Sequence, residues 1–497
     1  MTTPTWVSLL QNDFDAIIFD VGNTLVEQAP PTTPINELVA TPLRGVHETL
    51  SALQGNFRLG IVSNTTVLSG EQLQSLLAEM SDYFSVIIAT ADLGVHKPDP
   101  TPLLHAAQLL EVAPERCLYV GDIETDAHAA QAAGMAYCPT GPDLLHALER
   151  FASHRTTLAR AFLPSEPRKQ FASDIAAEID SLAKPPGAMG ELEVALQKIA
   201  AITHSPLPQI DPVALAIFVA DHEIAKDETV TPWPWEISRT IAELSQKGKI
   251  AANAFAQTAD VYVEVVDVGL ATGPTPQGVR NDRVRNGSGH PFPGPSLSIE
   301  EVHAAVHVGA QTAERLIAGG TRLLCVGEVG IGNTTPAAAI VAWALGVSAH
   351  EVTGRGSGID DVTLQRKTDV VAQLVEKSRA ETDPLMVLTH TGGLEIAALT
   401  GAILTATSMR IPVLLDGMIT VSAALLADRC VPTVRGNVLA SHVSPEPASS
   451  LALAELQLTP LLSLGLRIGE GTGALLAVPL LRSARNALVQ MARLHEL

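Results

Sequence analysis

The residues best suited to chemistry lie in one glycine-rich stretch, GEVGIGNTTP at positions 327–336. The apolar run before it predicts a short buried strand, and the run AAAIVAWAL after it predicts a buried helix. Thr335 is expected to cap that helix, with Pro336 at its first position. Glycines let a ligand approach the backbone, and free N–H groups at a helix start favour a phosphate. Glu328 is unexpected there, because a carboxylate beside an anion site needs a cationic or protonated partner.

Further glycine-rich or polar segments occur in the same half of the chain, at 354–361, 391–393, 441–447 and 467–473. One such loop is usually only a turn, but several in one domain, most with a charged or titratable residue, indicate a ligand site. Glu470 lies between two glycines, which offer little solvation, so its pKa can rise toward that of a useful base. The alternative is that Glu470 caps a helix starting near Thr472. His222 and His442 are more typical of structural histidines.

A second set of reactive side chains follows predicted strands in the first 150 residues. These strands are expected at 16–20, 58–62, 87–90 and 117–120. Because the carboxyl ends of parallel strands share one edge of a sheet, polar residues there can meet. Asp20 could attack phosphorus as a carboxylate nucleophile, with Ser63 and Lys97 holding the phosphoryl oxygens. Asp122 and Asp126 could help Asp20 bind Mg²⁺. Any one of these residues could simply cap a helix or face solvent, but four such signals in order favour a site.

These two sets of residues require two domains of the α/β class. At 497 residues the chain is too long for one ordinary core. In the C-terminal half, strand-like runs alternate with helices, which implies right-handed crossovers and a mostly parallel sheet. We expect a three-layer N-terminal domain over residues 1–150 and a doubly wound parallel-sheet domain with an added helical subdomain over 171–497. A locally basic linker, 151–170, joins them.

Composition narrows the classes of partner. The net charge of −21 argues against nucleic acid and anionic membrane surfaces. The four cysteines are scattered without metal-ligand spacing, so a reduced cytoplasmic location is expected and a zinc site is not. The N-terminus lacks the features of a signal peptide, and no stretch is long and apolar enough to span a membrane.

The motifs of the first 150 residues resemble those of the haloacid dehalogenase (HAD) superfamily. The resemblance implies an HAD-like hydrolase domain that uses Mg²⁺ bound by Asp20, Asp122 and Asp126. Phosphatases of that superfamily carry a second aspartate two residues after the nucleophile as general acid and base, and here that position is Gly22. Such assistance is typically worth ~10²–10⁴-fold, so Gly22 argues against phosphatase activity. The short gap between Asp20 and Ser63 leaves only a minimal cap and an open site.

The C-terminal motifs are similar, in order and spacing, to those of nicotinate-nucleotide–dimethylbenzimidazole phosphoribosyltransferases. The motifs are KPPGAMG, ADH, GEVGIGNTTPAAA, GRGSGIDD, TGGLEIAALTGAIL, PVLLDG, SHVSPEP and RIGEGTGA. The resemblance implies that Glu470 is the general base, that Glu328 also lies in the site, and that no cofactor is needed. The phosphate-holding loop would be Gly330, Gly332, Asn333, Thr334 and Thr335. Further substrate contacts are expected from Gly354, Gly356, Ser357, Gly358, Thr231, Trp235, His442 and Ile468.

The implied reaction transfers phosphoribose from nicotinate mononucleotide to 5,6-dimethylbenzimidazole or a related base, in cobalamin nucleotide-loop assembly. Trp235 stands where the family has a glutamine and Glu223 where it has a glycine, so the accepted base could differ. The N-terminal domain could then remove the 5′-phosphate. The alternatives are a non-catalytic N-terminal module, or a weak homologue that only binds and delivers the nucleotide. The resemblance also implies a homodimer through the C-terminal domain.

Overall fold

The computed structural model describes residues 4–11, 14–30, 33–140, 143–145, 147–148, 167–227, 230–292, 294–356 and 358–497. The chain divides into two compact units, Met1–Ala161 with Ala380–Thr382, and Phe162–Arg379 with Asp383–Leu497. The predicted linker, 151–170, lies outside the described residues except for 167–170, where helix α8 (Lys169–Asp180) begins. None of the helices in the described ranges is both long and apolar enough to cross a bilayer.

The N-terminal unit is built on a five-stranded parallel sheet in the order β3-β2-β1-β4-β5. Its strands are β1 (Ala16–Phe19), β2 (Arg58–Ser63), β3 (Val86–Ala89), β4 (Cys117–Gly121) and β5 (Ala136–Pro139). Its described helices are α1 (Thr5–Leu10), α2 (Val46–Leu53), α3 (Gly70–Leu76), α4 (Thr90–Leu93), α5 (Thr101–Leu109) and α6 (Glu124–Ala132). The predicted strands are present, and β5 adds a strand that the sequence did not indicate.

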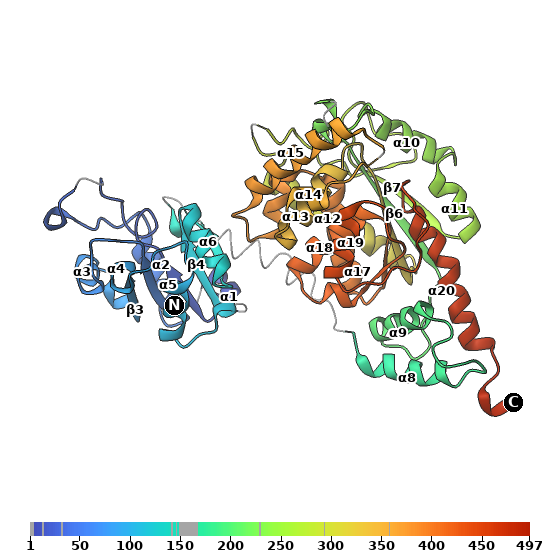
Figure 1. The fold of residues 1–497 in the computed structure, drawn as a ribbon, viewed down its shortest axis with the longest axis horizontal. Coiled ribbons are helices and arrows are strands. Elements are labelled where there is room, and N and C mark those ends of the chain that lie inside the picture. The colour runs from blue at the N-terminus through green and yellow to red at the C-terminus, as the bar shows by residue number, and fades with distance from the viewer. Residues whose placement is uncertain are drawn as a thin grey trace. The chain divides into compact units, whose positions relative to one another are not determined.

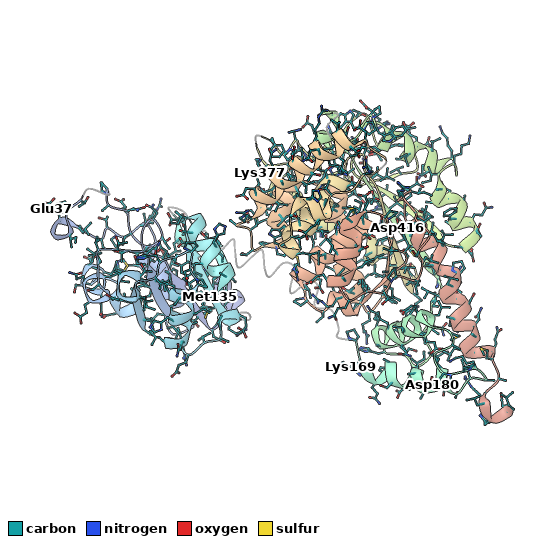
Figure 2. All side chains as sticks on the ribbon, viewed as in Figure 1. Glu37, Met135, Lys169, Asp180, Lys377 and Asp416 are labelled. Atoms are coloured by element: carbon teal, nitrogen blue, oxygen red, sulfur yellow. The ribbon has the colours of Figure 1, made fainter. Side chains whose placement is uncertain are left out.

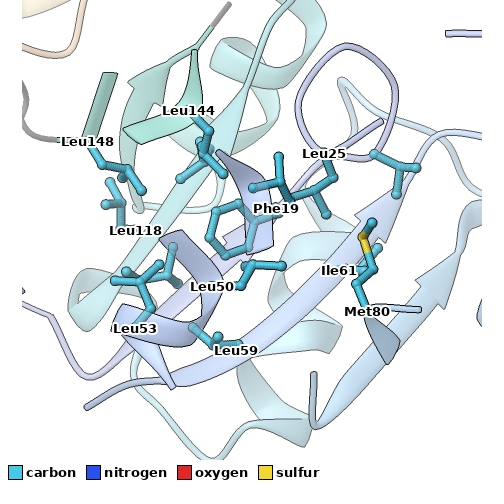
Figure 3. Close-up of a cluster of buried hydrophobic side chains, with 14 of the residues drawn as sticks. Phe19, Leu25, Leu50, Leu53, Leu59, Ile61, Met80, Leu118, Leu144 and Leu148 are labelled. Atoms are coloured by element: carbon cyan, nitrogen blue, oxygen red, sulfur yellow. The ribbon is translucent and has the colours of Figure 1, made fainter. Parts of the chain in front are cut away.

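Apolar side chains cover both faces of this sheet. On one face, Phe19 of β1 and Ile61 of β2 pack with Leu50 and Leu53 of α2 in a fully buried cluster (Figure 3). On the other face, Ile18 and Val62 pack against α5 and α6. Because alternate residues of each strand enter opposite cores, the sheet is held from both sides and its carboxyl edge is left for polar residues.

The C-terminal unit contains a six-stranded parallel sheet in the order β11-β10-β9-β6-β7-β8. Its strands are β6 (Val213–Ala220), β7 (Tyr262–Gly269), β8 (Arg280–Asn281), β9 (Leu323–Val329), β10 (Val413–Leu415) and β11 (Val438–Ala440). Strand β6 is buried along its whole length, as expected for the centre of a sheet covered on both faces. The strand order reverses on either side of the central pair, so this is the doubly wound parallel sheet that the sequence predicted.

Helices cover both faces of this second sheet. The helices are α9 (Glu191–Thr203), α10 (Ile237–Gln246), α11 (Ala251–Ala259), α12 (Ile299–Ala318), α13 (Thr334–Leu345), α14 (Ala349–Val352), α15 (Asp361–Ser378), α16 (Pro384–Thr391), α17 (Leu394–Ser408), α18 (Met418–Cys430), α19 (Pro447–Glu455) and α20 (Thr472–Gln490). Residues of α10, α11 and α20 pack on one face of the sheet, and α12, α17 and α18 contact it from the other helical layer. Figure 2 places Asp416 inside this unit, at the end of β10.

The predicted helical subdomain is formed by α8, α9 and the end of α20. Figure 1 shows α20 extending from the sheet toward α8 and α9. Ile175 and Ile179 of α8, Leu196 of α9 and Leu488 of α20 form a separate small core. This core joins the subdomain to the sheet through α20, and Ala195, Ile199 and Ile202 of α9 also pack in the core of the sheet.

Helices α12 and α17 cross closely because each places a glycine at the contact. A Cβ atom at Gly309 would lie 1.7 Å from the Ala398 carbonyl oxygen, and one at Gly401 would lie 1.9 Å from the Val306 carbonyl oxygen. Neither backbone can move away from an added Cβ atom unless the two packed helices separate.

We therefore expect Gly309→Ala to lower the free energy of unfolding by about 1–3 kcal/mol or more, the usual cost of overpacking a core. Urea denaturation followed by circular dichroism measures the loss. Gly294→Ala is the matched control, since a Cβ there meets no atom within 4 Å. Equal stability of the two variants would contradict the assignment of Gly309 to a close crossing.

Candidate active sites

A cavity of about 180 Å³ lies at the carboxyl ends of strands β9, β10 and β11 in the C-terminal unit. The glycine-rich loop after β9 forms one wall, and the segment 466–470 before α20 forms another. The cavity therefore brings Glu328 and Glu470 together, although they lie far apart in the sequence. Open parallel sheets of this kind bind their ligands at the carboxyl edge, where this cavity lies.

The glycine-rich loop has the form of an anion cradle, but its cap differs from the expectation. Helix α13 begins at Thr334 with Asn333 as its N-cap, so the prediction of Thr335 as the cap is wrong. The Asn333 side chain makes no capping bond and instead donates its Nδ2 to Glu328 Oε2. The Thr335 N–H bonds the Gly332 carbonyl oxygen at 3.1 Å, whereas the Thr334 N–H has no backbone partner among the described residues and can bind a ligand. Gly332 adopts a φ of 92°, which a residue with a side chain rarely takes.

The surroundings of Glu328 favour its protonated form, which removes the conflict between this carboxyl and an anion site. The residue is partly buried, and this burial together with the neighbouring Glu395 raises its pKa to about 8. Asp416 and Glu470 raise that pKa further, while the hydrogen bond from Asn333 opposes the shift. A neutral carboxyl beside the cradle does not repel a phosphate, so the loop can bind an anion near neutral pH.

Glu470 lies beside Glu328, whose carbonyl oxygen accepts from the Glu470 N–H at 3.2 Å, and its carboxylate reaches the start of another helix. Its Oε2 accepts a hydrogen bond of 3.0 Å from the N–H of Ala252, in the first turn of α11. It thus caps α11 rather than the helix that begins at Thr472. Burial raises its pKa, and the bonds from the backbone of α11 oppose that shift. Its backbone has a φ of 60°, between two glycines at 78° and 79°.

Asp416 fixes the turn at 469–473, which carries Glu470, by accepting hydrogen bonds from its backbone. Its Oδ1 accepts from the N–H of Gly473 at 2.7 Å, and its Oδ2 accepts from the N–H of Gly471 at 3.1 Å. These bonds satisfy the start of α20, as a capping carboxylate does. His442 packs against the same turn, and burial holds its pKa below the ordinary value, so it is neutral at pH 7.

The buried cation Lys367 stands behind the cradle and was not among the predicted residues. Its Nζ donates to Thr334 Oγ1 at 2.8 Å and to the Gly354 carbonyl oxygen at 3.0 Å. Burial lowers its pKa to about 8. Glu446 lies across from it and accepts from the N–H of Gly356 at 2.8 Å. A buried cation that no local sequence pattern indicates therefore lies next to the cavity, bonded to Thr334.

Most of the predicted transferase residues line the cavity. They are Glu328, Gly330, Gly332, Asn333, Thr334, Gly356, Thr231, His442, Ile468 and Glu470. Four others do not line it, namely Thr335, Gly354, Gly358 and Trp235. Ser357 lies outside the described residues. Polar or charged residues that the sequence reading did not select also line it, namely Asp416, Ser444, Glu446 and Arg467.

Trp235 stands away from the cavity and is covered by a cation. The Lys226 Nζ lies 4.1 Å from the centre of the Trp235 ring system, and Glu223 holds that amine at 2.9 Å. Cation–π contacts of this kind stabilise a ring orientation by about 0.5–1 kcal/mol at exposed sites. The apolar part of the cavity comes instead from Val230, Ile241, Met418, Ile419 and Leu466.

The N-terminal unit has its own cluster of charged side chains at the carboxyl edge of its sheet. Lys97 Nζ lies 2.7 Å from Asp20 Oδ1, 2.5 Å from Asp126 Oδ1 and 2.7 Å from Tyr119 Oη. Burial raises the pKa of Asp20 to about 6, against the opposing effect of Lys97. The Asn64 side chain bonds both the N–H and the carbonyl of Lys97 and so fixes its position.

Three carboxylates of this cluster can hold a metal ion. Ligand oxygens of Asp20, Asp122 and Asp126 all lie within 4.8 Å of one another. Hard oxygen donors of this kind suit Mg²⁺. Ser63 ends β2 on the same edge, next to Asn64. At Gly22, an added Cβ would have only ordinary contacts, at 3.7 Å, with the Gln28 side chain, so no acidic side chain occupies that space.

Comparison with known proteins identifies both units. Residues 165–496 match the family described as "Phosphoribosyltransferase", and residues 31–139 match the family described as "Haloacid dehalogenase-like hydrolase". The second match begins after Asp20, and the N-terminal unit is HAD-like in family and fold.

Similar full-length proteins match the C-terminal part. The chain is 42% identical over 346 residues to a nicotinate-nucleotide–dimethylbenzimidazole phosphoribosyltransferase of Salinispora tropica, covering 66% of this chain and 94% of that protein. The enzyme of that name from Thermus thermophilus is 39% identical over 319 residues, with 64% and 95% covered. A crystal structure of the nicotinate-nucleotide–dimethylbenzimidazole phosphoribosyltransferase from Thermus thermophilus has a TM-score of 0.63 at 37% identity, covering 66% of this chain and 98% of that one. Through its C-terminal unit, the chain belongs to the nicotinate-nucleotide–dimethylbenzimidazole phosphoribosyltransferase family.

Proposed function

We propose that the C-terminal unit transfers phosphoribose from nicotinate mononucleotide to a benzimidazole-type base, giving an α-riboside 5′-phosphate and nicotinate. The observation that carries this proposal is the single cavity that Glu470, Glu328 and the glycine-rich loop line together. The family match and the names of the relatives point to the same substrates.

The residues divide the chemistry among them. The pyridinium nitrogen of the donor is already positive, so the C1′–N bond can break with its electron pair going to nicotinate. One azole nitrogen of the base then bonds to C1′ from the opposite face, which converts a β-linkage to an α-linkage. Glu470 accepts the proton from the other azole nitrogen. Glu328, once ionised, stabilises the positive charge that develops on the ribose. Predicted partners are these small molecules, and no cofactor is proposed for this step.

We assign the phosphate to the N–H groups around Gly332 and Thr334, with Lys367 as the neutralising cation behind them. Replacing Lys367 by methionine keeps a long apolar stem and removes the charge. The KM for nicotinate mononucleotide is expected to rise about 10-fold or more, the value of a charge-assisted hydrogen bond of roughly 1.5–3 kcal/mol. The unphosphorylated riboside should react with wild type and variant alike, and steady-state kinetics with both donors checks this. An equal loss with both donors would place the phosphate elsewhere.

Incubation of the whole protein with nicotinate mononucleotide and a panel of azole bases tests the proposed function. Mass spectrometry is expected to find nicotinate and a base-linked ribose phosphate. Because Trp235 is covered by Lys226 and the cavity wall is apolar, we propose that unsubstituted and methylated benzimidazoles react and that bases carrying several polar groups do not. Absence of nicotinate release with every base would refute the transferase.

For the N-terminal unit, we propose that Asp20, Asp122 and Asp126 bind Mg²⁺, which would neutralise charge on a phosphoryl group, and that this unit releases the 5′-phosphate of the transferase product. The cluster of carboxylates favours this second activity, while Gly22 weakens it. The alternative is a scaffold that binds phosphate without hydrolysing it. A homodimer through the C-terminal unit and a cytoplasmic location stay predictions, and light scattering checks the first.

A further inference from the structure

A serine hydroxyl on the buried face of helix α10 bonds the glycine-rich loop. The buried residues of this helix are Ser238, Ala242 and Ser245, and Ser238 is completely buried. The Oγ of Ser238 accepts a hydrogen bond of 3.1 Å from the N–H of Ile331. A buried hydroxyl needs a partner, and a helical serine commonly donates to a carbonyl of its own helix. Ser245 does so, donating to the Ala242 carbonyl oxygen at 2.7 Å, whereas Ser238 bonds a residue outside its helix.

The bond at Ile331 bears on the two N–H groups beside it that an anion can use. Residues 330–334 line the cavity. In the described part of the chain, no side chain other than Ser238 bonds a main-chain N–H of this segment. The N–H groups of Gly332 and Thr334 have no partner among the described residues, so they are free to bind an anion. By holding the N–H of Ile331, Ser238 fixes the orientation of the chain that carries both donors.

The glycines of the loop are held by close packing instead. A Cβ at Gly330 would lie 3.0 Å from the Ala220 carbonyl oxygen, at the end of β6. A Cβ at Gly332 would lie 3.2 Å from the Ala225 Cβ. The glycine backbone therefore approaches the end of β6 and the turn after it closely. Packing of this kind sets the depth of the loop, and the hydrogen bond from Ser238 adds the direction.

The Ser238 hydroxyl also acts on the buried carboxyl of Asp221, which follows β6. Asp221 Oδ2 accepts from the N–H of Ala271 at 2.7 Å. Burial raises the pKa of Asp221, and the Ala271 N–H and the Ser238 side chain oppose that rise. Since the Ser238 oxygen accepts from Ile331, its own proton is free for Asp221. Helix α10 also contributes Ile241 to the apolar wall of the cavity, so Ser238 joins that wall to the glycine-rich loop.

We propose that Ser238 is a positioning residue of the phosphate site: by bonding Ile331, it holds the N–H groups of Gly332 and Thr334 in the orientation that binds an anion. The identity of the donor rests on the proposed function, whereas the role of Ser238 in fixing an anion-binding loop does not. Because Ser238 acts on phosphate binding, its loss should raise the KM for the phosphorylated donor and leave kcat at saturating donor close to that of wild type.

Hydrogen–deuterium exchange of the ligand-free protein tests the contact without any activity. Ser238→Ala removes the hydroxyl, and Ser245→Ala is the matched control, because it removes a buried hydroxyl of the same helix that bonds within that helix. Exchange over residues 327–336 should be faster in Ser238→Ala than in wild type or the control, because the Ile331 N–H loses its acceptor. Unchanged exchange in this segment would overturn the proposal, even if the transferase is fully active.

Isothermal calorimetry with nicotinate mononucleotide, its unphosphorylated riboside and inorganic phosphate tests the consequence. In Ser238→Ala, the Kd of the mononucleotide should rise about 3–10-fold, as expected for the loss of one neutral hydrogen bond, while the Kd of the riboside changes little. Equal increases for mononucleotide and riboside would overturn the proposal. Weaker binding of inorganic phosphate by Ser238→Ala, in a protein that binds no nicotinate mononucleotide, would support the role of Ser238 and refute only the proposed donor.

Discussion

Replacing Glu470 by glutamine is expected to lower kcat for base transfer by about 10²–10⁴-fold, the usual contribution of a positioned general base. The amide keeps the size of the side chain and an oxygen that can accept from Ala252, so the loop before α20 should stay in place. Without a basic oxygen, the incoming azole must lose its proton to water. Donor affinity should change little, because Glu470 acts on the base. Single-turnover formation of the riboside, followed by chromatography, measures the effect.

The matched control for Glu470 is a glutamate of the same unit that lies outside the cavity. Glu455 pairs with Arg429 at 2.9 Å on a partly exposed surface, and Glu455→Gln should leave the rate unchanged. The pH profile adds a second check. Because burial raises the pKa of Glu470, the rate of the wild type should fall with acid at a higher pH than for an ordinary glutamate. A Glu470→Gln variant that retains full kcat would exclude Glu470 as the base.

Installing an aspartate at Gly22 is expected to raise phosphate release by the N-terminal unit by about 10²-fold or more, since it supplies the missing general acid and base. The position can accept it, because an added Cβ would meet only the flexible Gln28 side chain, at 3.7 Å. Gly22 also lacks the positive φ that would make a side chain strained. Phosphate released from the α-riboside 5′-phosphate with Mg²⁺ present is the measurement.

Two companion variants make the Gly22 result interpretable. Gly22→Asn adds the same bulk without an acid, so it should give little or no increase. Asp20→Asn combined with Gly22→Asp should abolish the gain, because the nucleophile is lost. If Gly22→Asp released no more phosphate than wild type while still binding Mg²⁺, the scaffold alternative would be favoured for this unit.

The strands and the polar residues that follow them could be predicted, because the apolar run of a strand and the residues at its end are neighbours in the sequence. The run 16–19 is continuous and apolar and ends at Asp20, and the stretch at 323–336 carries its own strand, glycines and helix start. Parallel topology then brings strand ends together without further information. The prediction of the α13 cap was wrong because Asn333 and Thr335 are both good caps, and only the carboxyl group of Glu328, which accepts from the Asn333 side chain, decides how that side chain is used.

The residues that the sequence could not indicate depend on packing between distant elements. Lys367 lies within α15 among charged neighbours and reads as part of a solvated face, yet it is 1% exposed. The short strand β11, which leads to His442, has only three residues and no clear pattern. The anchoring of Glu470 by Ala252 joins positions 218 apart. Such contacts exist only after the fold has formed, so no local pattern contains them.

The left-handed backbone of Glu470 links the thermal stability of the domain to its catalytic residue. A residue with a Cβ at a φ of 60° costs on the order of 1 kcal/mol relative to glycine, and its two neighbours are already glycines. Glu470→Gly should relieve that strain, but it also removes the carboxylate that caps α11, which is worth about 0.5–2 kcal/mol, so the domain should change little in heat resistance while losing its base. Directed evolution for thermal tolerance alone would then put little pressure on this carboxylate, so only selection for riboside synthesis would preserve it.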